Sequence, residues 1–259
     1  MLAFLVLPLL AIFLRVPLGA LLDQLGSGVA VDAFVVTAKT TAIAFGLTVL
    51  VGTPAAYLLA LRRFPGRAVV ITLVELPLVL PPAVAGVALL AAFGRLGLLG
   101  STFDALGIRV GFTQTAVVLA LVFVSAPFYV RQAIAAFEAV DPNLLAAART
   151  LGAGPGRTFV RVALPLAAGG LGAGGAVALA RAIGEFGATI MFAGSLRGAT
   201  QTLSLAIYAE FDVNFDQALA LGALLIVISA IVLLTIKLLS RWRRSGSISL
   251  TGFAPSSSR

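Results

Sequence analysis

The chain has 259 residues, of which 60% are hydrophobic and only 11% are charged, and its mean hydropathy is +1.11. Soluble domains average roughly 25% charged residues, so this composition excludes an ordinary soluble domain. The net charge of +8 does not indicate nucleic-acid binding, because the basic residues lie beside apolar segments and no separate basic face with aromatics stands apart from them. Cys and His are absent from the sequence, which excludes thiolate metal sites and histidine relays, so we expect no metal site.

Apolar segments long enough to cross a bilayer recur along the whole chain. A transmembrane helix needs about 20 mostly apolar residues. Five segments meet that length, at residues 40–61, 68–93, 110–130, 162–196 and 217–236. A sixth and weaker segment, residues 2–22, contains Arg15. We interpret it as a retained helix, because it lacks the basic N-terminal region and small-residue cleavage site of a signal peptide. The sequence therefore predicts an all-α integral membrane protein with about six transmembrane helices.

The charged residues predict both the orientation and the organisation of the chain. Residues 62–67, 131–161 and the segment after residue 236 together carry twelve Lys or Arg residues against two acidic ones. Short loops rich in Lys and Arg stay in the cytoplasm, so we expect a multi-pass protein of the cell membrane with both termini cytoplasmic. We assign residues 1–30 to a first helix and external loop, residues 31–240 to a transmembrane core, and residues 241–259 to a short cytoplasmic tail. A start upstream of Met1 would move Arg15 toward a membrane face.

One cytoplasmic loop of the core, residues 137–165, has the pattern of a folded elbow. Asp141 and Pro142 form a strong helix start, with an N-cap acceptor followed by Pro at the first helical position. Gly152 stands where a helix ends in the left-handed conformation, and the Gly-Pro-Gly at 154–156 predicts a turn. Residues 157–164 are expected to form a second short helix before the next span. Attraction to anionic membrane lipid is an alternative use of this basic loop.

Charged and proline residues interrupt the second long apolar segment. Glu75 precedes Pro77, Pro81 and Pro82, and prolines break the hydrogen-bond ladder of a helix. A kinked helix at this point would line a translocation path or form a hinge. The alternative is structural, with the Glu75 carboxylate paired to an Arg or a Thr of a neighbouring helix.

A second pair of charges lies in the segment 162–196. Arg181 and Glu185 are four residues apart and would share one helix face. They are either an anion-attracting Arg restrained by a Glu, or an ion pair that holds the helix bundle together. The hydroxyls of Ser125 and Thr189 are further candidates for the path. The candidates for the path or its gate are therefore Glu75, Pro81, Pro82, Ser125, Arg181, Glu185 and Thr189.

The elbow resembles the cytoplasmic loop of ATP-binding-cassette importer permeases. That loop reads Glu-Ala-Ala, three residues, Gly, nine residues, an aliphatic residue, any residue and then Leu-Pro. In this chain Ala146 replaces the Glu, and the other positions match in register. The resemblance implies a coupling loop that docks on a separate ATPase subunit. The residues carried over to it are Ala146, Ala147, Ala148, Arg149, Gly152, Ala153, Leu164 and Pro165.

Two further stretches narrow the resemblance to the molybdate, tungstate and sulfate permease subfamily. They are LPLVLPPAVAGVALL at 76–90 and ARAIGEFGATIMFAG at 180–194. Within this region, the sequences GEFGATI and TQTLSLAIYAEF favour the molybdate branch over the sulfate branch. The subfamily implies a type I ABC importer transmembrane fold, a homodimer with the path on its two-fold axis, and an extracytoplasmic oxyanion-binding protein. Inward transport of the anion by alternating access would follow.

The chain itself carries no motif for nucleotide chemistry. No G-x-x-x-x-G-K-[ST] sequence occurs in it, and neither Lys39 nor Lys237 follows a Gly-rich loop. We therefore expect a transport subunit that is not an enzyme and has no cofactor, with ATP and Mg²⁺ held by the partner ATPase. An ATP-independent secondary transporter is the alternative from another class. It should show midplane carboxylates and an inverted repeat, and would leave the elbow unexplained.

Overall fold

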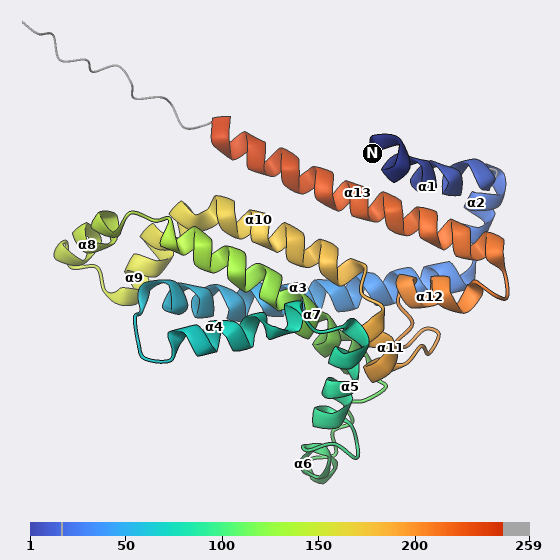
Figure 1. Cartoon of the computed structure of the whole chain (residues 1–259), viewed down its shortest axis with the longest axis horizontal. Helices are drawn as coiled ribbons and strands as arrows, with labels where there is room; N and C mark the ends of the chain where they lie inside the picture. The colour runs from blue at the N-terminus through green and yellow to red at the C-terminus, as the bar shows by residue number, and fades with distance from the viewer. Residues whose placement is uncertain (17, 246–259) are drawn as a thin grey trace, which may run out of the picture.

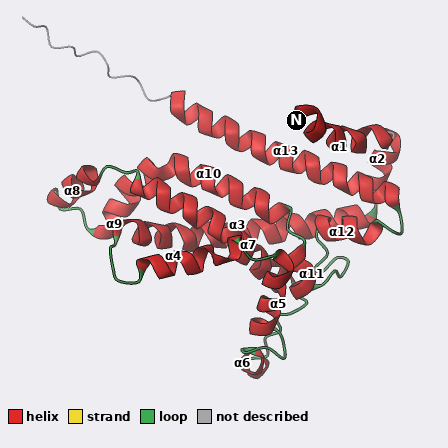
Figure 2. Cartoon of the chain, viewed as in Figure 1, coloured by secondary structure: helices red, strands yellow, loops and turns green. Residues whose placement is uncertain are grey.

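The computed structural model describes residues 1–16 and 18–245, and every regular element among them is a helix (Figure 2). The helices, in chain order and labelled as in Figure 1, are α1 (Leu2–Arg15), α2 (Leu18–Leu25), α3 (Gly28–Leu61), α4 (Arg67–Glu75), η1 (Leu76–Leu78), α5 (Pro82–Phe93), α6 (Gly100–Ala105), α7 (Gln114–Glu138), α8 (Pro142–Thr150), α9 (Pro155–Thr158), η2 (Phe159–Ala163), α10 (Leu164–Ile183), α11 (Gly187–Ala193), α12 (Leu203–Glu210) and α13 (Phe215–Ser245). Here η1 is a 3₁₀ turn and η2 is one turn of π-helix.

The long helices α3, α7 and α10 lie side by side, and α13 runs beside them along the molecule (Figure 1). Small residues let α7 and α10 approach closely. A Cβ added at Gly170 would lie 2.5 Å from the Cβ of Ala136, and one at Gly174 would lie 2.8 Å from the Cβ of Gln132. In a membrane such small-residue contacts hold helices together, because lipid tails are as apolar as the helix surface.

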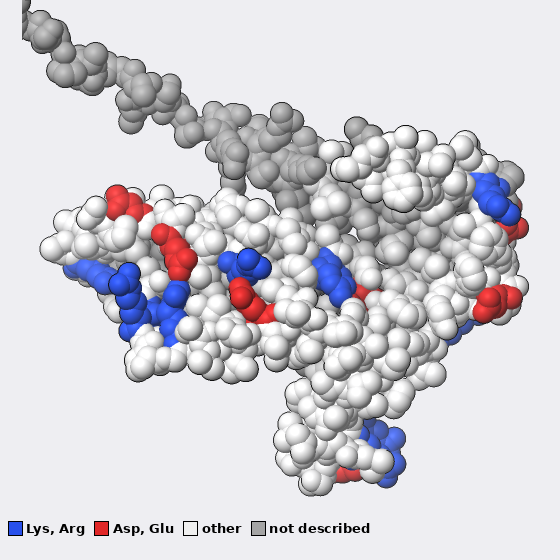
Figure 3. Space-filling view, viewed as in Figure 1, with Lys and Arg blue, Asp and Glu red and all other residues white. Residues whose placement is uncertain are grey.

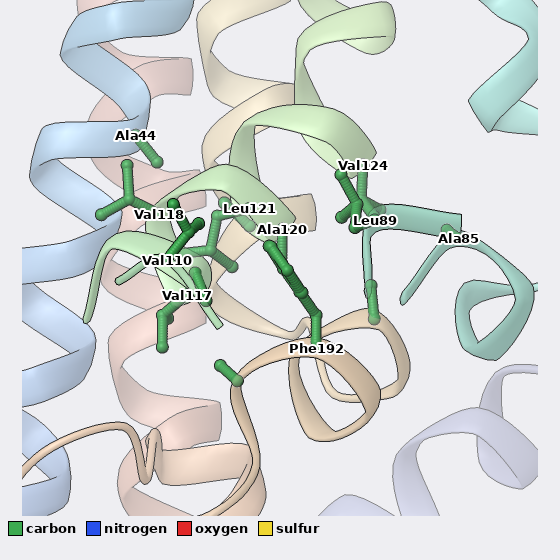
Figure 4. Packing of buried hydrophobic residues seen from close by; sticks show 14 residues of the cluster. Ala44, Ala85, Leu89, Val110, Val117, Val118, Ala120, Leu121, Val124 and Phe192 are labelled. Carbon is green, nitrogen blue, oxygen red and sulfur yellow. The ribbon is translucent and has the colours of Figure 1, made fainter. Parts of the chain in front are cut away.

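A second packing centre joins the bundle to α5 and α11. Phe192 of α11 is fully buried against Leu121 and Val124 of α7 and against Leu89 of α5 (Figure 4). Gly86 of α5 contacts α11 so closely that an added Cβ would lie 2.6 Å from a backbone oxygen. The pair α5 and α11 therefore forms one packed unit on the end of α7.

Four helices among the described residues are long and apolar enough to cross a membrane: Gly28–Leu61, Gln114–Glu138, Pro155–Ile183 and Phe215–Thr235. The pair Arg67–Leu78 and Pro82–Phe93 makes a fifth span if it is counted as one, although it is bent by 113°. By length and composition, the described helices thus give four or five spans, compared with the six that the sequence predicts. The segment predicted for it forms α1 and α2, of 14 and 8 residues. At the other end, α13 continues to Ser245, so the tail expected from residue 241 begins inside a helix and its later residues lie outside the described part.

The predicted span at 68–93 is not one helix. The α-helical backbone ends at Glu75, a 3₁₀ turn follows, and Pro81 is extended with ψ 135° before Pro82 opens α5 as its first residue. Pro82 has no N–H to donate and its ring excludes the helical conformation at Pro81. The predicted kink is therefore a full change of direction.

The predicted span at 162–196 is also divided. The helix ends at Ile183, the backbone leaves the helical region at Gly184, and the short helix α11 starts at Gly187. Glu185 lies in this gap and its Oε1 accepts a hydrogen bond of 2.7 Å from the N–H of Ala188. The carboxylate satisfies a free N–H of the first turn of α11, so it stabilises a new helix start instead of continuing α10.

Candidate functional site

The elbow between α7 and α10 has the local structure predicted for its first half. Asp141 Oδ1 accepts a hydrogen bond of 2.9 Å from the N–H of Asn143, and Pro142 is the first residue of α8. Gly152 follows the end of α8 with φ +81°, the left-handed conformation that glycine adopts without strain. The start and the end of α8 are thus both set by local chemistry.

The second half of the elbow differs from the prediction. Pro155 does not sit in a turn but opens α9, and the helical path continues through η2 into α10 without interruption up to Ile183. The expected separate helix at 157–164 is therefore the first part of the membrane span, and Pro165 lies inside that span. The second half of the elbow and the span thus form one helix of 29 residues, Pro155–Ile183.

Buried contacts attach the elbow firmly to the bundle. Leu145 of α8 is 4% exposed, and the fully buried Thr158 donates from its hydroxyl to the carbonyl of Gly154 over 3.1 Å. The ring of Phe159 packs on Tyr57 of α3 at 4.7 Å between centroids and on Phe137 of α7 at 6.2 Å. Helices α3, α7 and α10 thus meet at the base of the elbow.

The predicted coupling residues lie mostly on the surface. Those exposed are Ala146, Ala147, Arg149, Gly152 and Pro165, and those partly buried are Ala148, Ala153 and Leu164. Sequence reasoning missed Leu144 and Leu151, whose side chains on the same elbow are 47% and 88% exposed. Two exposed leucines beside small alanines make an apolar surface suited to a protein contact.

The first charged residue of the spans, Glu75, faces α7. Its carboxylate lies 3.7 Å from Nε of Arg131, with side-chain exposures of 37% for Glu75 and 69% for Arg131. Nearer the elbow, Arg67 of α4 contacts Glu138 of α7 at 2.6 Å. The sequence predicted an Arg or Thr partner for Glu75 without identifying it, because residues 56 positions apart share no local pattern.

The second charged pair is much tighter. Nη1 of Arg181 lies 2.5 Å from Oε2 of Glu185, whose side chain is 1% exposed, while that of Arg181 is 27% exposed. The residues pair as predicted, but Glu185 lies beyond the end of α10 and so joins α10 to α11. Figure 3 shows basic and acidic side chains gathered along the face over α4, α7 and α10.

The remaining path candidates separate into surface and interior residues. Pro81 and Pro82 are exposed at the bend between η1 and α5. Ser125 is buried and donates to the carbonyl of Leu121 of its own helix over 2.6 Å. Thr189 is fully buried, and its hydroxyl has no hydrogen-bond partner among the described residues. The structure therefore places Ser125 and Thr189 in the protein interior.

An apolar groove of about 510 Å³ runs between α3, α7 and α10. Gly172 and Gly175 of α10 and Phe45 of α3 contribute to its walls. Its polar feature is the pair Thr53 and Tyr129, whose hydroxyls lie 2.6 Å apart. No sequence motif indicated this pair, because Thr53 and Tyr129 each lie within an apolar segment. Among the described residues no three potential metal ligands gather in one place.

A bundle of long apolar helices, with an elbow whose second half continues into one of them, defines a polytopic membrane protein. The chain belongs to the family described as "Binding-protein-dependent transport system inner membrane component", which matches residues 49–245. The resemblance to ATP-binding-cassette importer permeases is thereby confirmed, and the protein is a multi-pass permease subunit of that class.

The chain is similar to named permeases over most of its length. It is 44% identical over 233 residues to "Molybdenum transport system permease protein ModB" of Mycobacterium tuberculosis, covering 89% of this chain and 88% of the relative. It is 39% identical to the ModB protein of Escherichia coli K12, covering 82% and 92% respectively. Similarity extends to "Sulfate transport system permease protein CysW" of Synechocystis, at 36% identity over 80% of this chain and 75% of the relative.

Solved structures confirm the predicted type I importer fold. A chain of a bacterial alginate ABC transporter in complex with a periplasmic protein superposes with a TM-score of 0.70 at 19% identity, covering 93% of this chain and 90% of that chain. A chain of the MetNI methionine ABC transporter in an inward-facing conformation superposes with a TM-score of 0.62, covering 83% and 95%. At this identity the similarity concerns the fold alone.

Proposed function

We propose that this chain is the permease subunit of an ATP-driven oxyanion importer and that its substrate is molybdate. The observation that carries the proposal is the 44% identity to a molybdenum permease over nearly the whole chain. The GEFGATI stretch, which covers the gap after α10 and the first turn of α11, supports the same branch. Sulfate is the second candidate, favoured by the 36% identity to a sulfate permease, and tungstate has the same charge and shape as molybdate.

The working assembly that we propose has two copies of this chain, two cytoplasmic ATPase subunits that hold ATP and Mg²⁺, and an extracytoplasmic oxyanion-binding protein. The family description supports dependence on a binding protein. The exposed charged face and the loosely packed α4 support the homodimer, because both would otherwise contact lipid. The excess of Lys and Arg on the elbow side supports cytoplasmic termini.

Coupling in this proposal starts at α8. The ATPase contacts the surface made by residues 146–149, Gly152 and Ala153, together with the exposed Leu151. Ala146 offers no carboxylate, so docking depends on shape and apolar contact. Movement of α8 passes into the continuous helix Pro155–Ile183, and the aromatic contact of Phe159 with Tyr57 carries it to α3. The helices then rock between inward-facing and outward-facing states.

The test of the substrate is the ATPase activity and anion uptake of the reconstituted complex with its binding protein. Molybdate, tungstate and sulfate are compared in proteoliposomes at equal concentrations. We expect stimulation by molybdate and tungstate and little by sulfate. Equal stimulation by sulfate would overturn the choice of molybdate, and transport without ATP would overturn the importer itself.

The test of the coupling loop is Gly152→Asp with Gly154→Asp as its matched control. Gly152 has φ +81°, so a side chain there strains the turn by roughly 1 kcal/mol and adds a charge to the docking surface. Gly154 is the N-cap of α9 with φ −65°, where Asp is a favoured residue. We expect only Gly152→Asp to lose ATPase association while remaining in the membrane. Unchanged association and uptake in Gly152→Asp would contradict the docking assignment.

A further inference from the structure

The ion pairs Arg181–Glu185 and Arg131–Glu75 differ in a way that separates their roles. Glu185 is almost completely buried, contacts Arg181 at 2.5 Å and accepts the N–H of Ala188, so both of its oxygens are occupied. Glu75 lies 3.7 Å from Arg131, and both side chains are partly exposed. The Arg181 charge is therefore committed to a structural contact, whereas most donors of the Arg131 guanidinium remain available.

Arg131 is exposed near the end of α7 that leads to the elbow. It directly follows the predicted span 110–130 and lies seven residues before Glu138, the end of α7, which corresponds to about 10 Å along the helix axis. Its side chain is 69% exposed, so its guanidinium can reach water at the end of the bundle nearest the elbow. A translocation path that opens on that side would meet this guanidinium.

The carboxylate that faces Arg131 belongs to a weakly attached helix. None of the nine residues of α4, all of which the structure describes, is buried. The helix is linked to α7 by the contact of Arg67 with Glu138 and by the looser pair of Glu75 with Arg131. Just beyond Glu75 the chain bends by 113°. Glu75 and Arg131 lie 3.7 Å apart and both side chains reach the surface, so a small movement of α4 is enough to separate them.

We propose that Arg131 is a transient binding site for the transported tetrahedral oxyanion in the half of the path nearest the elbow, and that Glu75 competes with the anion for its guanidinium. This site rests on the proposed function, because it requires an oxyanion as cargo. The planar guanidinium offers parallel N–H donors that match two oxygens of a tetrahedral dianion. Competition by Glu75 keeps the site weak, as a transport path requires, because an anion held tightly would not leave.

A structural pair and a competed anion site make opposite predictions for the two partners. If the pair only joins α4 to α7, Arg131→Gln and Glu75→Gln break the same contact and cause the same loss. If Arg131 binds the anion, Arg131→Gln removes the site and Glu75→Gln frees it. We therefore measure molybdate binding to the permease–ATPase complex in nanodiscs, without the binding protein, by equilibrium dialysis with labelled molybdate.

We expect Arg131→Gln to abolish this binding and Glu75→Gln to tighten it by about tenfold, the usual effect of freeing a charged hydrogen-bond donor. Arg131→Lys keeps the positive charge but lacks the parallel N–H donors of the guanidinium, so it should give intermediate molybdate binding. In proteoliposomes with the binding protein, Arg131→Gln should lower molybdate uptake by about tenfold or more. Arg197→Gln is the control, because it breaks an exposed ion pair with Asp32 of α3 that involves neither α4 nor α7 and should leave molybdate binding unchanged.

Equal losses of binding in Arg131→Gln and Glu75→Gln, or unchanged binding in Arg131→Gln, would overturn the site. The proposed function is judged separately by the wild-type complex. If the wild type imports molybdate while Arg131→Gln binds and imports it equally well, only the site is refuted. If the wild type imports sulfate instead, the choice of substrate is refuted, and the same comparison with sulfate then tests Arg131.

Discussion

Removing Arg181 should destabilise the protein strongly, because it leaves a buried carboxylate without its counter-charge. The Glu185 side chain is 1% exposed and contacts the Arg181 guanidinium at 2.5 Å. Breaking a buried ion pair from one side costs about 3–5 kcal/mol. Coulomb's law gives a similar value, roughly 4 kcal/mol for charges about 4 Å apart at an effective dielectric constant of about 20. Because Arg181 is 27% exposed, we expect the lower end, about 3 kcal/mol, for Arg181→Ala.

The reverse substitution, Glu185→Gln, should cost much less. The amide oxygen of Gln still accepts the N–H of Ala188, so the start of α11 keeps its cap. Arg181 loses its partner but is partly exposed, so its charge can reach water. We expect a loss of about 1 kcal/mol, the size of one ordinary hydrogen-bond contribution.

The assay is denaturant unfolding of the purified protein in detergent, with the two single variants and Arg181→Ala/Glu185→Gln. The double variant no longer buries a free charge and should be more stable than Arg181→Ala alone by about 2 kcal/mol, the difference between the two single losses. A loss below about 0.5 kcal/mol for Arg181→Ala, or equal losses in the two single variants, would refute the reasoning that Glu185 is a buried, charge-paired cap.

Five further variants test packing, a buried polar pair and a surface pair, each by the same unfolding measurement. Gly86→Ala should destabilise by about 1–3 kcal/mol because its Cβ overlaps α11, whereas Gly172→Ala, whose Cβ meets no described atom within 4 Å, should stabilise α10 by up to about 1 kcal/mol. Equal effects would contradict the close contact. Tyr129→Phe should cost about 1 kcal/mol, because the Thr53 hydroxyl keeps its hydrogen bond to its own helix. Thr53→Val should cost more, because it leaves the Tyr129 hydroxyl without a hydrogen-bond partner. The reverse order would contradict the hydrogen-bond assignment. Arg197→Ala breaks an exposed ion pair with α3 and should change stability by less than about 1 kcal/mol, and a larger loss would show that the pair is desolvated.

Local chemistry made α8 predictable from the sequence. The cap at Asp141, the Pro that follows and the left-handed Gly152 each act within a few residues, so a single chain shows them. The spans 40–61 and 217–236 were also located correctly within the longer helices α3 and α13, because about 20 apolar residues need no partner information to be recognised.

The sequence predicted where the two broken spans lie but not how their backbone is bent or divided. The prolines at 81 and 82 predicted a kink, but its size depends on how α5 packs on α11 through Gly86. The predicted span at 162–196 was too long for a bilayer, and a Glu between Gly184 and Gly187 was an available sign of a helix break. High hydropathy on both sides of this Glu conceals the break in a search for apolar spans.

The arrangement of contacts indicates where movement of the elbow is taken up. The second half of the elbow is continuous with α10, the end of α10 is held to α11 through Arg181 and the buried Glu185, and α11 is packed against α5 at Gly86. These connections should make the three segments move together. Helix α4 has no buried residue and precedes the bend that leads into α5. We infer that displacement of the elbow changes the angle between α4 and α5, and with it the distance from Glu75 to Arg131.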